Sequence, residues 1–138
     1  MPTPLRCDPK LLEKDLSGQV IIVTGANSGC GLETARQLAS QKATVIMACR
    51  SPERGQAAAE DVGGVFLAPM DLSSLQSVRD FVKAFQEKYT RLDVLINNAC
   101  VQKIIHNRRR ASMDTQLLFS AFLASTKQGH HGVSFCEN

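Results

Sequence analysis

The stretch that decides the fold is Val20-Ile21-Ile22-Val23-Thr24-Gly25-Ala26-Asn27-Ser28-Gly29-Cys30-Gly31-Leu32. Its four branched apolar residues predict a strand that is buried on both faces, as in a parallel sheet. A turn-rich octet follows, and a pattern typical of a helix begins after it. A buried strand, a glycine turn and a helix N-terminus in this order form a binding site for the pyrophosphate of a nucleotide.

The three glycines of this turn, at positions 25, 29 and 31, have the spacing G-x-x-x-G-x-G. Glycine lets the backbone approach the phosphates closely, and the free N–H groups of the first helical turn face the negative charge. The spacing differs from the G-x-G-x-x-G of the common dinucleotide fingerprint. The functional prediction therefore depends on the motifs that follow.

Composition and charge describe a globular domain. The chain has 138 residues, of which 43% are apolar and 21% charged, enough for one domain with a core. The formal net charge of +3 resides entirely in residues 101–138, because residues 1–100 carry 11 basic and 11 acidic side chains. A neutral body argues against nucleic acid as the main partner.

The cysteines indicate a reducing compartment. They are Cys7, Cys30, Cys49, Cys100 and Cys136, an odd number without metal-ligand spacing. Without a secretory signal they are expected to be free thiols, so we expect a cytoplasmic location. No apolar run approaches the roughly 20 residues that span a bilayer, so no transmembrane segment is expected.

Strand-like and helix-like segments alternate along the chain. The strands are predicted at residues 20–23, 43–49, 65–68 and 92–96. Ser51-Pro52-Glu53 opens one intervening helix, and Ser73 or Ser74 caps the next. The alternation implies a parallel sheet with right-handed crossovers and helices on both faces, which is a three-layer α/β fold.

Three regions are expected. Residues 1–17 form an N-terminal lead-in, with a short helical turn within residues 11–16. Residues 18–100 form an α/β half-domain that binds a nucleotide, and residues 101–138 form a divergent C-terminal tail.

Three motifs follow one another along the chain. They are Thr24–Gly31 after the first predicted strand, Asp71-Leu72 after the third, and Asn97-Asn98-Ala99-Cys100 after the fourth. They resemble the T-G-x-x-x-G-x-G turn, the D-L and the N-N-A-G of the short-chain dehydrogenase/reductase family, with Cys100 in place of the last glycine. The sequence around them, including Met47-Ala48-Cys49-Arg50, most resembles the retinol dehydrogenase-like branch. The resemblance covers roughly residues 18–100 and implies an incomplete Rossmann-type sheet with strand order 3-2-1-4.

The resemblance also implies contacts with a dinucleotide. The residues implied to wrap the pyrophosphate and the adenosine ribose are Gly25, Asn27, Ser28, Gly29, Cys30 and Gly31. Asp71 and Leu72 would contact the adenine, while Asn98 and Ala99 would line the adenine-ribose side of the cleft. For Cys30 two interpretations stand, a reactive thiolate at a helix N-terminus and a small packing residue between glycines, and the second is favoured.

Arg50 indicates which nicotinamide cofactor is bound. In this fold an acid after the second strand hydrogen-bonds the ribose 2′-OH of NAD, whereas an arginine accommodates the 2′-phosphate of NADP. The chain has Cys49-Arg50 there and no acid until Glu53. Because guanidinium pairs bidentately with phosphate, we expect NADP(H) rather than NAD(H). The alternative is a solvated loop arginine.

The catalytic residues of the family have no counterpart here. The family uses a serine after its fifth strand and Tyr-x-x-x-Lys on the following helix. The one tyrosine, Tyr89, is followed four residues later by Asp93 and precedes the fourth strand. No catalytic residue is therefore predicted. The resemblance implies an oxidoreductase acting on a carbonyl or alcohol, such as a retinoid-like apolar substrate, that is inactive in this truncated form. The alternative is a non-catalytic nucleotide-binding remnant or an interaction protein.

The tail does not resemble the continuation of the family. We hypothesise that it results from a shifted reading frame or an alternative splice, which makes the chain a truncated product. Arg108–Arg110 is either a basic patch or a solvated turn, and the run of three favours the turn. His106, His130 and His131 lack an acid or cysteine at ligand spacing, so no metal site is predicted.

Truncation would leave the fourth strand, residues 92–96, with an unpaired edge. Such an edge favours self-association or pairing with a full-length relative. The apolar run Leu117–Ala124 is expected to form a short helix whose most useful position is over this edge.

Overall fold

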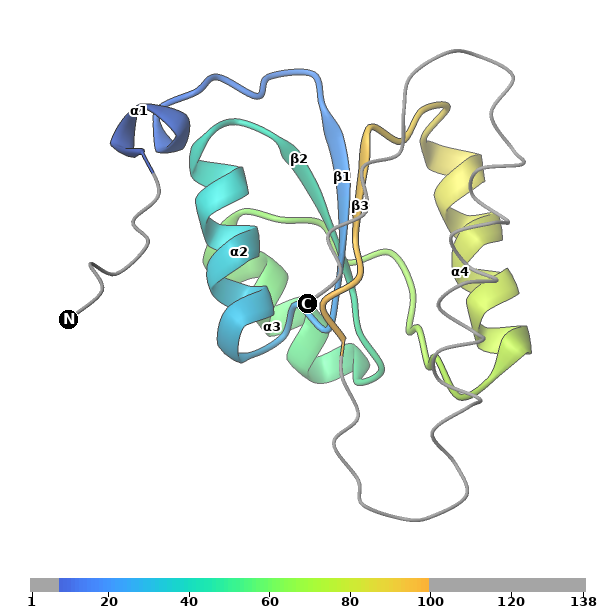
Figure 1. The fold of residues 1–138 in the computed structure, drawn as a ribbon. Helices are drawn as coiled ribbons and strands as arrows, with labels where there is room; N and C mark the ends of the chain where they lie inside the picture. Colours follow the sequence, from blue (N-terminus) through green and yellow to red (C-terminus); the bar gives the residue numbers. More distant parts are fainter. Residues whose placement is uncertain (1–7, 100–138) are drawn as a thin grey trace, which may run out of the picture.

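The computed structural model describes residues 8–99 (Figure 1). The expectations for Cys100 and for residues 101–138 lie outside the described residues. The described elements, in chain order, are α1 (Pro9–Leu12), β1 (Val20–Thr24), α2 (Gly29–Ser40), β2 (Thr44–Ala48), α3 (Pro52–Val62), α4 (Leu75–Lys88) and β3 (Val94–Ile96).

The sheet has three parallel strands in the order β2-β1-β3. β1 is central, because all five of its residues pair with β2 and residues 21–23 also pair with β3. α2 and α3 cover one face of the sheet, and α4 covers the other (Figure 1). The predicted three-layer α/β fold is confirmed, and the strand order matches the 2-1-4 part of the predicted order.

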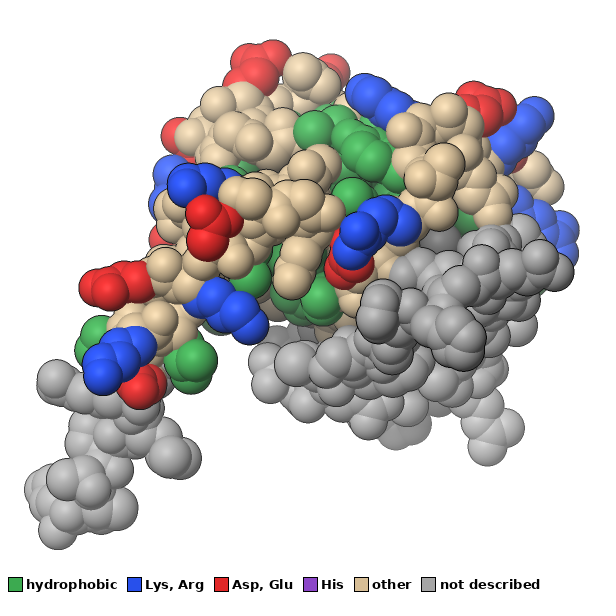
Figure 2. Space-filling view, turned by 90° about the horizontal axis from the view of Figure 1, so that it is seen from above, with side chains coloured by type: hydrophobic (Ala, Val, Ile, Leu, Met, Phe, Trp, Pro, Cys, Tyr) green, Lys and Arg blue, Asp and Glu red, His purple; other side chains and the backbone are tan. Residues whose placement is uncertain are grey.

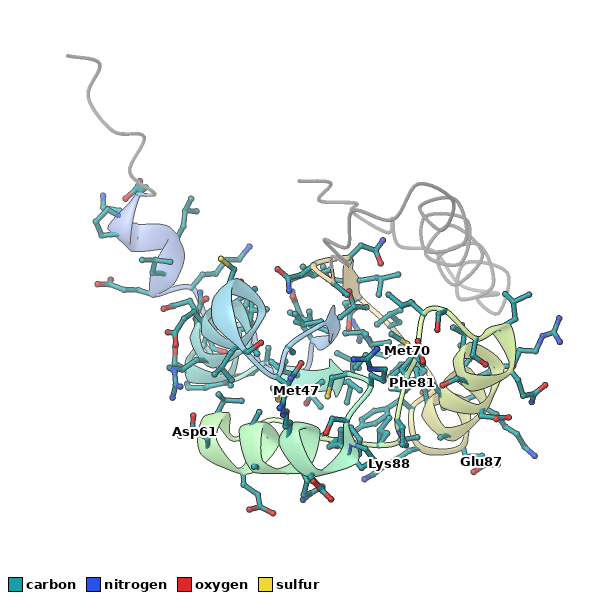
Figure 3. The ribbon with its side chains drawn as sticks, turned by 90° about the horizontal axis from the view of Figure 1, so that it is seen from below. Met47, Asp61, Met70, Phe81, Glu87 and Lys88 are labelled. Carbon is teal, nitrogen blue, oxygen red and sulfur yellow. The ribbon has the colours of Figure 1, made fainter. Side chains whose placement is uncertain are left out.

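Each face of β1 packs into its own hydrophobic cluster. Ile22 belongs to the cluster beneath α4, together with Phe81 and Leu95, whereas Ile21 belongs to the cluster beneath α2 and α3. None of these four side chains is more than 2% exposed. Figure 3 looks onto the carboxyl ends of the strands and shows Phe81 on the α4 side and Met47 on the α3 side. Burial on both faces explains why the apolar run of β1 is continuous.

The third predicted strand, residues 65–68, is reduced to a single bridge. Val65 pairs in parallel with Ile46 of β2, and its N–H and C=O each form a 2.8 Å hydrogen bond with that strand. The segment therefore lies along the outer edge of β2, where the order 3-2-1-4 places it. The pairing ends after this bridge, and Pro69, which lacks an N–H, could not extend the ladder to the end of the segment.

Serine caps begin two of the helices, as the sequence predicts. The side chain of Ser51 accepts a hydrogen bond from the backbone N–H of Arg54, with proline at the start of α3. Ser74, rather than Ser73, caps α4 by accepting from the backbone N–H of Ser77.

The helical turn of the lead-in begins earlier than expected. It is α1, at Pro9–Leu12, because the Asp8 carboxylate accepts the backbone N–H of Lys10 at 3.0 Å and caps an earlier start. Proline at the first helical position adds to this signal.

Polar side chains at the end of α2 hold the lead-in. The Gln41 amide is 9% exposed and donates to the carbonyl oxygens of Leu11 at 2.9 Å and Lys14 at 3.0 Å. Lys42 forms an ion pair with Asp15 at 2.8 Å. The part of the lead-in that the structure describes, residues 8–17, is therefore tied to α2. Within residues 8–99, no helix combines the length and apolar character that crossing a membrane requires.

We expect Phe81→Ala to lower the free energy of unfolding by about 3–5 kcal/mol, because it removes a fully buried aromatic ring between α4 and the sheet. Denaturant unfolding followed by circular dichroism measures this change. Leu75→Ala, at a side chain that is 46% exposed on the same helix, is the matched control and costs far less. Equal losses in the two variants would show that α4 is not packed as described.

Candidate functional site

The motif residues lie at the carboxyl end of the sheet. Figure 2 looks onto the opposite end, where hydrophobic side chains reach the surface in the middle of the face and charged ones lie around them. All three strands end at the same edge, the lower one in Figure 1. The chain leaves β1 toward β2, and β3 pairs on its other side. The gap between β1 and β3 is thus the switch point at which parallel α/β sheets bind ligands.

The turn after β1 depends on its glycines. Gly25 and Gly29 have φ of +65° and +58°, a region that side chains rarely adopt. A Cβ at Gly25 would lie 2.9 Å from Cα of Ala99. A Cβ at Gly31 would lie 2.5 Å from the carbonyl oxygen of Gly25 and would collide with the Asn98 amide nitrogen. Close contact between the turn and the loop after β3 therefore excludes side chains at positions 25 and 31.

The first turn of α2 has no side-chain cap. Ser28 is the N-cap residue, and its side chain makes no capping hydrogen bond. In contrast, Ser51 and Ser74 cap α3 and α4. The leading N–H groups of α2 are thus left for another acceptor, at the end of the helix that carries partial positive charge. This arrangement suits an anionic ligand.

Thr24 joins β1 to the loop after β3. Its side chain is 0% exposed. The hydroxyl oxygen accepts the backbone N–H groups of Asn98 at 3.0 Å and Ala99 at 2.9 Å, and the hydroxyl donates to the carbonyl oxygen of Ile96 at 3.4 Å. One buried hydroxyl therefore fixes the backbone of the loop that the sequence assigns to the site.

The Asn98 side chain forms a second link between the β3 loop and the end of β1. Its amide nitrogen donates to the carbonyl oxygen of Thr24 at 3.0 Å, with a longer contact of 3.5 Å to that of Gly25. The Gly25 N–H donates to the carbonyl oxygen of Ala48 at 2.8 Å. The glycine turn is thus held from β2 on one side and from the β3 loop on the other.

Asp71 is fixed by two serines. Its carboxylate accepts the backbone N–H of Ser73 at 2.9 Å and the Ser73 hydroxyl at 2.7 Å. Its own backbone N–H donates to the Ser77 hydroxyl oxygen at 2.9 Å. The Ser73 hydrogen bonds lower the pKa of Asp71 below its usual value, and the positive charge of Arg50 lowers it further, against the opposing effect of partial burial.

Arg50 lies beside Asp71 because of a backbone contact. The N–H of Met70 donates to the carbonyl oxygen of Cys49 at 2.9 Å, which brings together the residues that follow each of them. The Arg50 side chain is exposed. Within residues 8–99 its guanidinium forms no hydrogen bond or ion pair, whereas Arg36 and Arg91 each pair with an aspartate. Among the described residues, therefore, no side chain neutralises the Arg50 guanidinium through a direct contact.

Other predicted site residues have different surroundings. Leu72 is 8% exposed and belongs to the core cluster beneath α4, so its side chain packs against the helix. Cys30 is an exposed free thiol. Asn27 is partly buried, and Ser28 and Gly29 are exposed in the turn.

Two residues that position the site, Thr24 and Ser73, are not identified as such by the sequence motifs. Thr24 belongs to the glycine-turn motif without a predicted role, and Ser73 is predicted only as a possible helix cap. A hydroxyl residue at the end of a buried apolar strand is the signal that identifies Thr24, since a buried hydroxyl needs partners.

Tyr89 lies at the other end of the molecule. It is the C-cap residue of α4 and therefore precedes β3, at the amino end of the sheet. Its ring stacks on Phe85 with centroids 5.4 Å apart, and burial raises its pKa. Among residues 8–99, no group of three or more histidines, cysteines or acids is placed to hold a metal ion.

Comparison with known proteins identifies relatives. A family model described as "short chain dehydrogenase" matches residues 19–128. Mouse (Mus musculus) retinol dehydrogenase 13 is 41% identical over 97 residues, which are 66% of this chain and 29% of that protein. Human (Homo sapiens) dehydrogenase/reductase SDR family member 13 is 50% identical over 91 residues, 62% of this chain and 24% of that protein. The chain thus spans less than a third of the length of these relatives.

The structure is also similar to solved structures. One is a metagenomic short-chain oxidoreductase in complex with NADP, with a TM-score of 0.70 and 28% identity. The match covers 82% of this chain and 58% of that one. The described body therefore corresponds to part of a larger domain.

We expect Thr24→Val to lower the free energy of unfolding by about 1–3 kcal/mol, because it removes the buried hydroxyl oxygen that accepts the N–H groups of Asn98 and Ala99. Chemical denaturation measures the loss. Thr24→Ser is the matched control: it keeps the hydroxyl, removes one methyl group, and is expected to cost about 0.8 kcal/mol. If the serine variant loses as much stability as the valine variant, the hydroxyl does not hold this loop.

Proposed function

Because this chain belongs to the short-chain dehydrogenase family, we propose that it is the nucleotide-binding half of an NADP(H)-dependent oxidoreductase. The family consists of oxidoreductases that use NAD(P). The observation that carries the proposal is the uncapped N-terminus of α2 beside a glycine turn that admits no side chain at positions 25 and 31.

The residues of the site fit a dinucleotide in two respects. The N-terminus of α2 supplies N–H groups and partial positive charge for the pyrophosphate, and glycines leave room for it. Asn98 and Ala99 lie at the switch point beside Thr24, and Asp71 lies in the segment that is hydrogen-bonded to the end of β2, where the adenosine half is expected. When bound, the nicotinamide group of such a cofactor supplies or accepts a hydride.

Arg50 supports NADP(H) over NAD(H). It follows β2 directly, its guanidinium is exposed, and it has no ion-pair partner among the described residues. A guanidinium in this position suits the 2′-phosphate that distinguishes the two cofactors.

We propose that these 138 residues do not catalyse turnover by themselves. The family chemistry uses a tyrosine as general acid/base and a lysine four residues on. The single tyrosine of the chain, Tyr89, lies at the amino end of the sheet, away from the cofactor turn. The substrate of the complete enzyme is proposed to be a carbonyl compound or alcohol, with an apolar retinoid-like molecule suggested by the names of the relatives.

A second proposed role is association with another chain. Among the residues that the structure describes, β3 pairs only with β1. An open edge of a parallel sheet accepts a further strand through its backbone groups. A second copy of the chain or a full-length relative would supply this strand.

The free thiols of Cys30 and Cys49 support the proposal of a reducing, cytoplasmic environment.

We expect the chain to bind NADPH and to show no turnover. Binding is measured by the fluorescence of the reduced nicotinamide, and turnover by its absorbance in the presence of a panel of aldehydes. Absence of binding would contradict the nucleotide-site proposal, and turnover above background would contradict the proposal that the chain is inactive.

Two glycine variants control this experiment. Gly31→Ala places a methyl group against the Gly25 carbonyl oxygen and is expected to abolish NADPH binding. Gly63→Ala, at φ of +72° after α3, strains the backbone but meets no atom within 4 Å, so it is expected to lower stability while binding persists. Loss of binding in both variants would indicate that it reflects unfolding rather than the site.

We expect the purified chain to associate in a concentration-dependent way through the β3 edge. Sedimentation velocity measures the association. Leu95 is fully buried, so the test variant is Val94→Lys, which adds a charge to a partly buried edge residue and is expected to shift the chain toward monomer. A stable monomer across all concentrations of the unmodified chain would contradict this proposal.

A further inference from the structure

The candidate site holds an acid, Asp71, next to Arg50, the arginine that is proposed to bind the 2′-phosphate. The inference that follows rests on the proposed NADP(H) function. We infer that Asp71 is a specificity-determining residue whose carboxylate competes with the cofactor 2′-phosphate for Arg50, so that the chain accepts NAD(H) as well as NADP(H).

The backbone places the two residues side by side. The hydrogen bond of 2.9 Å from the Met70 N–H to the Cys49 carbonyl oxygen joins the end of β2 to the segment before α4. Arg50 and Asp71 each follow one of these residues. The main chain therefore brings the two segments together, and the positive charge of Arg50 acts on the Asp71 carboxylate.

Hydrogen bonds hold the carboxylate of Asp71 in place. Ser73 donates to one carboxylate oxygen through both its N–H and its hydroxyl. The Ser77 hydroxyl accepts the Asp71 N–H and fixes the backbone. The negative charge is thus held in the segment next to Arg50, the residue proposed to bind the 2′-phosphate.

Asp71 does not form a contact ion pair with Arg50. No hydrogen bond or ion pair joins its guanidinium to any residue within the described range, so the two charges attract each other without a contact ion pair. The arginine remains open to a phosphate, but Asp71 offsets part of its charge. A phosphate approaching Arg50 also meets repulsion from Asp71.

The consequence differs between the two cofactors. NAD(H) has a neutral 2′-OH, so it meets no such repulsion, and Asp71 compensates the arginine charge that NAD(H) leaves unpaired. NADP(H) gains the attraction of Arg50 but loses part of it to Asp71. Contacts of Asp71 with the adenine are common to both cofactors and cancel when their affinities are compared.

The test is the ratio of the dissociation constants of NADH and NADPH, measured by titration calorimetry on the full chain. Asp71→Asn is expected to change this ratio by about threefold or more in favour of NADPH at low salt. The change should shrink at high ionic strength, because the interaction is between partly exposed charges. Loss of an adenine contact alone would weaken both cofactors equally and leave the ratio unchanged.

A matched control and a second background isolate the cause. Asp80→Asn removes the same charge from the exposed face of α4 and is expected to leave the ratio unchanged. In an Arg50→Gln background, Asp71→Asn should have a much smaller effect on the ratio. In the chain without ligand, Arg50→Gln should raise the pKa of Asp71, observed by NMR titration of its carboxyl group.

The outcomes separate the inference about Asp71 from the proposed function. A ratio that shifts toward NADPH in Asp71→Asn and depends on Arg50 supports the inference. A ratio that is unchanged, or that shifts toward NADH, overturns it while the proposed function stands. If the unmodified chain binds neither cofactor, the proposed function fails and the inference fails with it.

Discussion

The hydroxyl of Thr24 is the interaction on which the site depends. It is fully buried at the end of β1 and accepts the N–H groups of Asn98 and Ala99. These bonds hold the loop after β3 against the glycine turn, and Gly25 and Gly31 have no side chains because that loop is so close. The shape of the switch point therefore follows from one buried polar group that must find partners within the protein.

With the turn held in this way, electrostatics determines what it can bind. α2 lacks the serine cap that begins α3 and α4, so its N-terminus is left to an anion. Arg50 adds a cation at the end of β2, and we infer that Asp71 partly offsets it. On this proposal the N-terminus of α2 serves the pyrophosphate, and the pair Arg50 and Asp71 serves the 2′ position of the ribose.

Much of this fold is predictable from local signals. The apolar run of β1, the Ser51-Pro52 start of α3 and the apolar face of α4 each specify an element through burial or capping. Residues 65–68 show the limit, because their apolar character suits a strand but only Val65 pairs with β2. The motifs predict which segments form the candidate site. The role of Thr24 and the proximity of Arg50 and Asp71 could not be predicted, because they depend on hydrogen bonds between segments far apart in the sequence.

We propose that this chain carries a nucleotide site at the carboxyl end of its sheet. Mapping amide chemical shifts by NMR during titration with NADP⁺ tests this proposal. We expect the largest changes in the turn at residues 25–31 and at Arg50, Asp71 and Asn98. An absence of changes, or changes centred on the amino end of the sheet near Tyr89, would contradict it.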